Sequence, residues 1–129
     1  KEFVKMTTLA SLEEIFVLQT CLGGEKMKLD NTQKLISQIV DWHHNRNLID
    51  GSTDQAQFVK LMEEAGELAS SIGKKKNPVD DIGDMIVVLI NIAERNNLTI
   101  DECLAKAWDD IKDRKGKMID GVFVKEGDS

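Results

Sequence analysis

Proline, tyrosine and aromatic residues in general are scarce in this sequence of 129 residues. It contains one proline, no tyrosine, four phenylalanines and two tryptophans. A single proline and the lack of tyrosine leave little material for a turn-rich β fold. With so few aromatic residues, the core must consist mainly of leucine, isoleucine, valine, methionine and alanine side chains. These absences favour helices over sheets.

Cysteines and long apolar runs are scarce too, and basic residues are outnumbered by acidic ones. The two cysteines, Cys21 and Cys103, lie far apart and follow no metal or redox spacing, which is typical of a reduced cytoplasmic protein. The longest apolar run, residues 85–90, is too short to span a membrane, and no secretory signal pattern is present. The formal net charge of −6 argues against binding to nucleic acid polymers through their phosphates. We therefore expect a cytoplasmic protein with neither a membrane nor a nucleic acid partner.

Apolar residues recur at helical spacing through most of the chain. This periodicity predicts helices over residues 31–46, 53–73, 78–95 and 99–115. A weaker helical pattern covers residues 8–22 and is interrupted at Gly23 and Gly24. Near the end of the chain, residues 122–124 are predicted to form a short extended piece.

Residues that start and stop helices support these boundaries. Asn77 is a suitable N-cap and Pro78 fits a first helical turn. Thr99 and Glu102 have the spacing of a capping box. The lysines at 74–76 complement the dipole at the end of the preceding helix. The chain therefore carries clear signals at the turn before residue 78 and at the start of the last helix.

The predicted helix at 78–95 is apolar on every side, which is typical of the centre of a bundle or of a subunit interface. The sequence thus predicts an all-α protein, a four- to five-helix bundle that assembles through this helix. Met27 could be a natural start, in which case residues 1–26 are an N-terminal extension and residues 27–129 form the domain. Alternatively, residues 1–26 are the first helix of that domain.

Two acidic clusters lie on consecutive predicted helices. Carboxylates three residues apart are neighbours on one helix face, and a short turn between antiparallel helices would bring both clusters together. Converging carboxylates repel one another unless a cation lies between them, and hard oxygen ligands select Mg²⁺ or Mn²⁺. The alternative is that the cluster on the first of these helices forms only a solvated face. The cluster on the second helix would then consist of acidic residues that are favourable in any first helical turn. The clusters consist of Glu63, Glu64 and Glu67 and of Asp80, Asp81 and Asp84.

Asp84 favours the metal interpretation, because it borders the most apolar helix and a buried charge needs a partner. The sequence Glu63-Glu64-Ala65-Gly66-Glu67-Leu68, followed by Asp81-Ile82-Gly83-Asp84, resembles the signature of the MazG-like all-α nucleoside triphosphate pyrophosphatases. That signature is Glu-Glu-x-x-Glu followed by Glu-x-x-Asp on the next helix. The resemblance covers residues 29–125. Asp81 departs from it, since the family has glutamate at that place.

The resemblance implies a Mg²⁺-dependent hydrolase that converts a nucleoside triphosphate, either ribo or deoxy, to the monophosphate and pyrophosphate. Glu64, Glu67 and Asp84 match the metal ligands, with Asp81 as a fourth and with Mn²⁺ as the alternative ion. Glu63, Glu64 and Glu67 are the catalytic candidates, and Asp80 could contribute. Such a reaction needs no covalent nucleophile, because a carboxylate-held water attacks phosphorus directly.

The resemblance also points to basic residues near the chain end as phosphate ligands. Lys112, Arg114 and Lys115 belong to this stretch. Lys106 lies about one turn earlier and is expected either to pair with Glu102 or to bind phosphate.

Trp42 and His43 are candidates for a base pocket, since aromatic faces stack on bases and the family uses the preceding helix in this way. The alternative places Trp42 in the core and the histidines on the surface. Trp108 is expected in the core. The resemblance further implies a homodimer or homotetramer.

The sequence bears on two other functions. A di-iron carboxylate bundle needs Glu-x-x-His pairs, and neither His43 nor His44 has a glutamate at that offset. A non-catalytic helical module that binds a partner remains the alternative, because the aspartate at position 81 is compatible with a degraded metal site.

Overall fold

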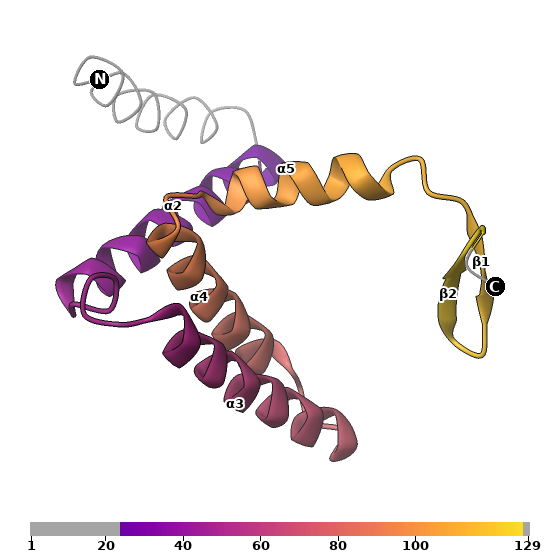
Figure 1. Cartoon of the computed structure of the whole chain (residues 1–129), viewed down its shortest axis with the longest axis horizontal. Coiled ribbons are helices and arrows are strands. Elements are labelled where there is room, and N and C mark those ends of the chain that lie inside the picture. The colour runs from indigo at the N-terminus through magenta and orange to yellow at the C-terminus, as the bar shows by residue number, and fades with distance from the viewer. Residues whose placement is uncertain (1–23, 128–129) are drawn as a thin grey trace. The chain divides into compact units, whose positions relative to one another are not determined.

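The computed structural model describes residues 24–127, with side chains from residue 31 onward. The chain divides after Ser52 into two units. The weak pattern at 8–22 and the predicted boundary at residue 26 concern a segment that lies mostly outside the described residues. The first unit contains α2 (Gly24–Asn45), and the second contains α3 (Asp54–Gly73), α4 (Val79–Arg95), α5 (Ile100–Ile111), β1 (Gly116–Ile119) and β2 (Val122–Lys125) (Figure 1). The described chain is mostly helical, as predicted.

Helix α2 begins seven residues before the predicted start at residue 31. The two glycines at 23 and 24 indicated a break, but the residues after them include lysine, methionine and leucine, which are good helix formers. The end of the helix agrees with the prediction. Asn47 adopts a left-handed conformation (φ 56°) just beyond it, and the amide of Leu48 donates to the carbonyl of His43 at 2.9 Å.

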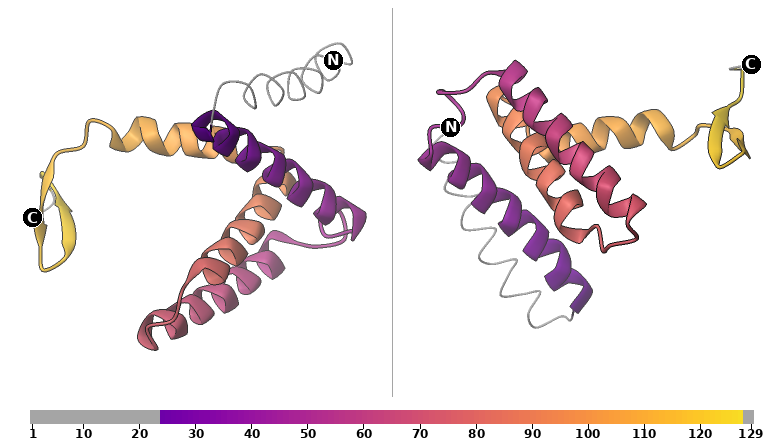
Figure 2. Two further views of the ribbon diagram at one scale, coloured as in Figure 1. Left: turned by 180° about the vertical axis from the view of Figure 1, so that it is seen from behind. Right: turned by 90° about the horizontal axis from the view of Figure 1, so that it is seen from below.

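Helices α3 and α4 form an antiparallel hairpin and lie side by side in every view (Figures 1 and 2). The hydroxyl of Thr53 caps α3 by accepting from the amide of Ala56 at 3.1 Å. In the turn at 74–78, Lys75 has φ 55° and the Asn77 side chain accepts from the amide of Val79 at 3.1 Å. The predicted turn is thus confirmed. Asn77 bonds to the first turn of α4 from one residue before the N-cap, which is Pro78 rather than Asn77.

The buried faces of this hairpin differ from the predicted apolar stripes. On α3, Phe58 and Met62 are exposed, whereas Glu64 is buried between the half-buried Leu61 and Leu68. The alternative that places Glu64 on a solvated face is therefore wrong, because the face that meets α4 is rotated from the most apolar face.

Helix α4 is buried on one side only. Ile90 and Asn91 are its most buried side chains, with Val88 and Ala93 beside them. A second apolar stripe is exposed among the described residues and has the alternating three- and four-residue spacing of a coiled-coil seam. It consists of Val79, Ile82, Ile86 and Leu89.

Helix α5 begins as predicted, because the Thr99 hydroxyl accepts from the amide of Glu102 at 3.1 Å. The prediction that Trp108 lies in the core is wrong, since its exposed fraction is 63%. Leu104 and Ile111 on the same face are exposed as well. Helical periodicity shows which side chains share a face, but it does not show whether another element covers that face.

Strands β1 and β2 form an antiparallel hairpin in which Ile119 pairs with Val122. Only the second strand was predicted. Asp120 (φ 49°) and Gly121 (φ 80°) both have positive φ, as a type I′ turn requires, and an Asp-Gly pair between apolar residues is the sequence signal for it.

None of the helices within residues 24–127 is long and apolar enough to cross a membrane.

Candidate metal centre

Three of the predicted carboxylates converge on the α3–α4 hairpin. Glu64 and Glu67 lie one turn apart on α3, and Asp84 lies on the facing part of α4. One oxygen from each side chain lies within 4.8 Å of an oxygen from the other two. The three-residue spacing on α3 and the short turn to α4 produce this arrangement, as the sequence predicted.

Glu64 occupies the most buried position of the three, with an exposed fraction of 6%. Its Oε1 atom lies 2.7 Å from Nζ of Lys60, one turn earlier on α3. Its Oε2 atom is buried and accepts no hydrogen bond from any residue in the described part of the chain. Buried carboxylate oxygens almost always have a partner, so this atom points to a ligand at the cluster.

The electrostatics of the cluster show an excess of negative charge. The pKa of Glu67 is raised above its ordinary value, chiefly by the negative charge of Glu64. The pKa of Asp84 is also raised, first by burial and then by the charges of Asp80 and Glu64. The ammonium of Lys60 opposes both shifts without cancelling them. A bound divalent cation would relieve this repulsion.

The donor set fits a hard divalent ion. All three side chains offer carboxylate oxygen, and Mg²⁺ is usually held by a few carboxylates while it keeps several waters for exchange with phosphate oxygens. Two of the three side chains reach the solvent, so such exchange is sterically open. Mn²⁺ prefers the same donors.

The other acidic candidates lie around this cluster rather than in it. Asp81 is half-buried, and its charge contributes to the raised pKa of Glu67 and of Asp84, but it is not one of the three converging residues. Glu63 is exposed, with Oε2 lying 3.4 Å from Nζ of Lys60.

Lys106 lies on α5, whereas Lys112, Arg114 and Lys115 lie in the segment that joins α5 to β1. Lys106 pairs with Asp110 at 2.7 Å, so the predicted ion pair with Glu102 is wrong; the lysine reaches one turn forward instead of back. Lys112 pairs with Asp109, also at 2.7 Å. Arg114 lies two residues further along the chain.

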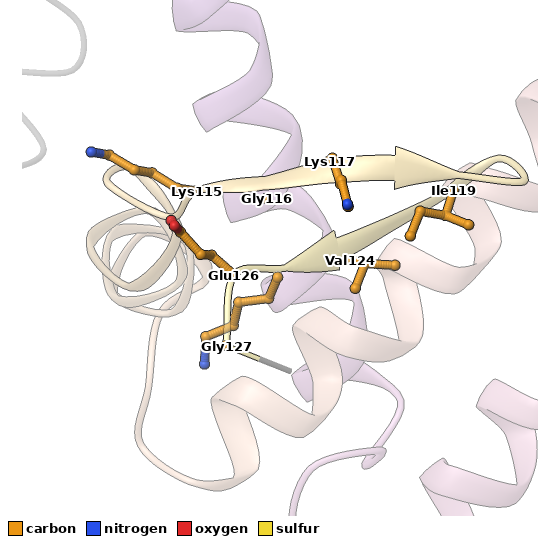
Figure 3. A pocket seen from close by; sticks show the side chains of 8 residues that line it. Lys115, Gly116, Lys117, Ile119, Val124, Glu126 and Gly127 are labelled. Carbon is orange, nitrogen blue, oxygen red and sulfur yellow. The ribbon is translucent and has the colours of Figure 1, made fainter. Parts of the chain in front are cut away.

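Lys115 borders a pocket of about 580 Å³ on the β-hairpin. Lys117, Ile119 and Val124 extend from one side of the hairpin, whereas the Lys115 side chain extends away from it (Figure 3).

The cation that contacts the carboxylates is Lys60, which the sequence prediction missed. Its position four residues before Glu64 is the signal that could have revealed it, because residues at this spacing are neighbours on a helix.

Trp42 and His43 lie at the end of α2, in the first unit. Trp42 is exposed, and the Arg46 guanidinium stacks over its ring with 4.4 Å to the centroid. His43 is buried, with an exposed fraction of 3%, and its ring meets that of Trp42 edge-on at 5.3 Å. The alternative that placed Trp42 in the core and His43 on the surface is wrong for both residues. The base pocket stays a prediction.

Comparisons with known proteins give one relative of unstated function. The chain is similar to the uncharacterized 18.2 kDa protein of the rep-hol intergenic region of Haemophilus phage HP1, with 49% identity over 76 residues. The match covers 57% of this chain and 45% of the relative, so the similarity spans less than half of the relative's length. No family model matches the chain. No solved structure matches it either.

Proposed function

We propose that this protein is a Mg²⁺-dependent nucleoside triphosphate pyrophosphohydrolase of the MazG-like all-α type. The observation that carries the proposal is the convergence of Glu64, Glu67 and Asp84 around a buried Glu64 oxygen without a hydrogen-bond partner in residues 24–127. The order of the acidic residues along α3 and α4 supports it, because it follows the family signature. The phage relative neither supports nor opposes the proposal, since its name states no activity.

The three converging carboxylates would hold the ion, with Asp81 close enough to contribute through water. Bound Mg²⁺ would neutralise part of the negative charge of the triphosphate and orient the triphosphate for in-line attack. Glu63 and Glu67 are exposed, so they are the carboxylates placed to hold the attacking water and accept its proton. A bond forms between the water oxygen and the α-phosphorus, while the bond from that phosphorus to the α–β bridging oxygen breaks. Pyrophosphate leaves with the bridging oxygen, and the monophosphate is the other product.

Substrate contacts beyond the ion are proposed for the remaining candidates. Lys106, Lys112, Arg114 and Lys115 would bind phosphate oxygens, and Trp42 with His43 would contact the base. Lys106 and Lys112 would have to exchange their present aspartate partners for phosphate. The exposed stripe on α4 would form the interface of a homodimer or homotetramer. Control of nucleotide pools or removal of unwanted nucleotides in the cytoplasm is the role that follows.

Pyrophosphate release from the common ribo- and deoxyribonucleoside triphosphates tests the proposal. The wild type should release pyrophosphate and the monophosphate with Mg²⁺ and stop in EDTA. Glu67→Gln should release pyrophosphate at least about 100-fold more slowly. Glu102→Gln, which alters an exposed carboxylate on α5, should match the wild type. No turnover of any substrate by a chain with a normal circular dichroism spectrum would favour the non-catalytic, partner-binding module.

A further inference from the structure

Lys60 stands out among the residues around the carboxylates because it brings a positive charge to the place where an ion is proposed. Its Nζ atom lies 2.7 Å from Oε1 of Glu64 and 3.4 Å from Oε2 of Glu63. Its side chain is half exposed, at 51%, whereas that of Glu64 is 8% exposed. The lysine thus reaches the buried carboxylate from the solvent side of α3.

The contact with Lys60 stabilises the buried negative charge of Glu64 when no ion is bound. Glu64 is a buried carboxylate with two more carboxylates nearby, and such a charge is costly without a partner. The ammonium offsets part of the repulsion that Glu67 and Asp84 experience. It supplies one positive charge to at least three negative ones, so it stabilises the cluster without neutralising it.

The same contact opposes the binding of a divalent ion. An ion held by Glu64 brings two positive charges within a few ångströms of the lysine ammonium, and like charges repel at that distance. Any strengthening of the Glu64–ion interaction also weakens the Glu64–Lys60 ion pair, because both draw on the same carboxylate. The buried Oε2 atom, which accepts no hydrogen bond from any described residue, leaves the carboxylate able to receive the ion while Lys60 is still in place.

We propose that Lys60 is the internal counter-ion of this site: it stabilises the ion-free carboxylate cluster and thereby lowers the affinity of the cluster for a divalent cation. The inference rests on the metal centre of the proposed function. A residue that only positions Glu64 would have the opposite effect, because its loss would weaken ion binding. The direction of the change in affinity therefore separates the two roles.

Mn²⁺ binding to the full chain without nucleotide, measured by calorimetry, tests the counter-ion role. Lys60→Met keeps the unbranched apolar stem of the side chain and removes the charged amino group. It should bind Mn²⁺ about three- to tenfold more tightly than the wild type, a modest factor because the ammonium is half exposed. Its unfolding temperature in EDTA should fall. Lys60→Gln, which retains hydrogen bonding, should behave like Lys60→Met.

Two controls accompany this measurement. Lys60→Arg keeps the charge, and Lys74→Met makes the same change of net charge at the end of α3; both should stay within about twofold of the wild-type Mn²⁺ affinity. Equal or weaker Mn²⁺ binding by Lys60→Met would overturn the counter-ion role. Failure of the wild type to bind Mn²⁺ would instead overturn the metal centre and the proposed function with it.

Discussion

Arg95, the last residue of α4, donates from Nε to Oδ1 of Asp54, the first residue of α3, at 2.9 Å. Asn96 donates to the other oxygen of the same carboxylate at 3.2 Å. The short turn at 74–78 joins the opposite ends of these helices. The hairpin that carries the candidate metal ligands is therefore closed at both ends, once by the chain and once by this polar contact.

Asp54 is expected to stabilise the hairpin in a pH-dependent way. Hydrogen bonds from Arg95 and Asn96 lower its pKa. A carboxylate with a lowered pKa contributes stability above its unfolded pKa, and this contribution is lost as the pH falls through its folded pKa. Urea unfolding should therefore show Asp54→Asn to be less stable than the wild type near pH 7, with a smaller difference at about pH 3. Asp50→Asn, in the preceding loop, should change neither value; an equal deficit at both pH values would contradict the prediction.

The carboxylate cluster should give the opposite pH dependence when no ion is bound. Because the pKa values of Glu67 and Asp84 are raised in the folded protein, the folded state binds more protons than the unfolded state between the ordinary and raised values. Stability contributed by the cluster should therefore fall as the pH rises through that window. Near neutral pH, Mg²⁺ at about one hundred times its dissociation constant should add about 2.7 kcal/mol.

Thermal unfolding with Mg²⁺ and with EDTA measures this effect. The ion-dependent shift should be present near neutral pH and should disappear as the carboxylates are protonated. A shift of the same size at acid pH would show that the ion binds elsewhere.

Glu67→Gln should separate stability from function. The substitution removes a negative charge that Glu64 repels, so the ion-free variant should unfold at a higher temperature than the wild type. The Mg²⁺-dependent increase should be lost, and pyrophosphate release should fall by about 100-fold or more, since even indirect support of a metal ligand is worth 10- to 100-fold. Glu63→Gln, outside the three converging carboxylates, should retain Mn²⁺ binding. A lower unfolding temperature for Glu67→Gln would show that the cluster does not strain the fold.

Gly83 offers a test of the space beside the cluster. It lies inside α4 next to Asp84, and an added Cβ would meet no atom within 4 Å in the described part of the chain. Replacement by alanine should therefore stabilise the helix by about 0.5–1 kcal/mol in urea unfolding. Gly51→Ala is the matched control and should destabilise the protein, because its Cβ would lie 2.5 Å from the carbonyl oxygen of Asn47. Destabilisation by Gly83→Ala would show that this surface is covered in solution.

The two sides of α4 should respond differently to substitution. Ile90 is 1% exposed, so Ile90→Ala should cost about 2–5 kcal/mol in the free energy of unfolding. Ile86 belongs to the exposed stripe, so Ile86→Lys should leave the helical circular dichroism spectrum intact while reducing the molar mass measured by light scattering. An unchanged molar mass would show that this stripe is not the subunit interface.

Local signals predicted much of the fold and part of the site. The cap at Thr99 and the turn after Gly73 act through bonds between residues close in sequence, and both are present. The convergence of Glu64 with Asp84 followed from helical spacing and a short turn.

Burial was harder to predict, because it depends on which surface meets each helix face. The exposed Trp108 and the buried Glu64 both reverse the preference expected from their polarity. The partner of Lys106 was missed for a related reason: acidic residues lie one turn away in both directions, and spacing does not choose between them. The first strand of the β-hairpin is absent from the prediction, although the Asp120-Gly121 pair is a local turn signal for it.

The lysine counter-ion and the three converging carboxylates all belong to residues 60–84 of one helical hairpin. Contacts between residues this close in sequence require little loop-closure entropy and form early when a chain folds. Repulsion among the carboxylates therefore acts on a nascent contact rather than only on the finished protein. A divalent ion present during refolding would consequently accelerate folding itself, besides slowing the loss of the native state.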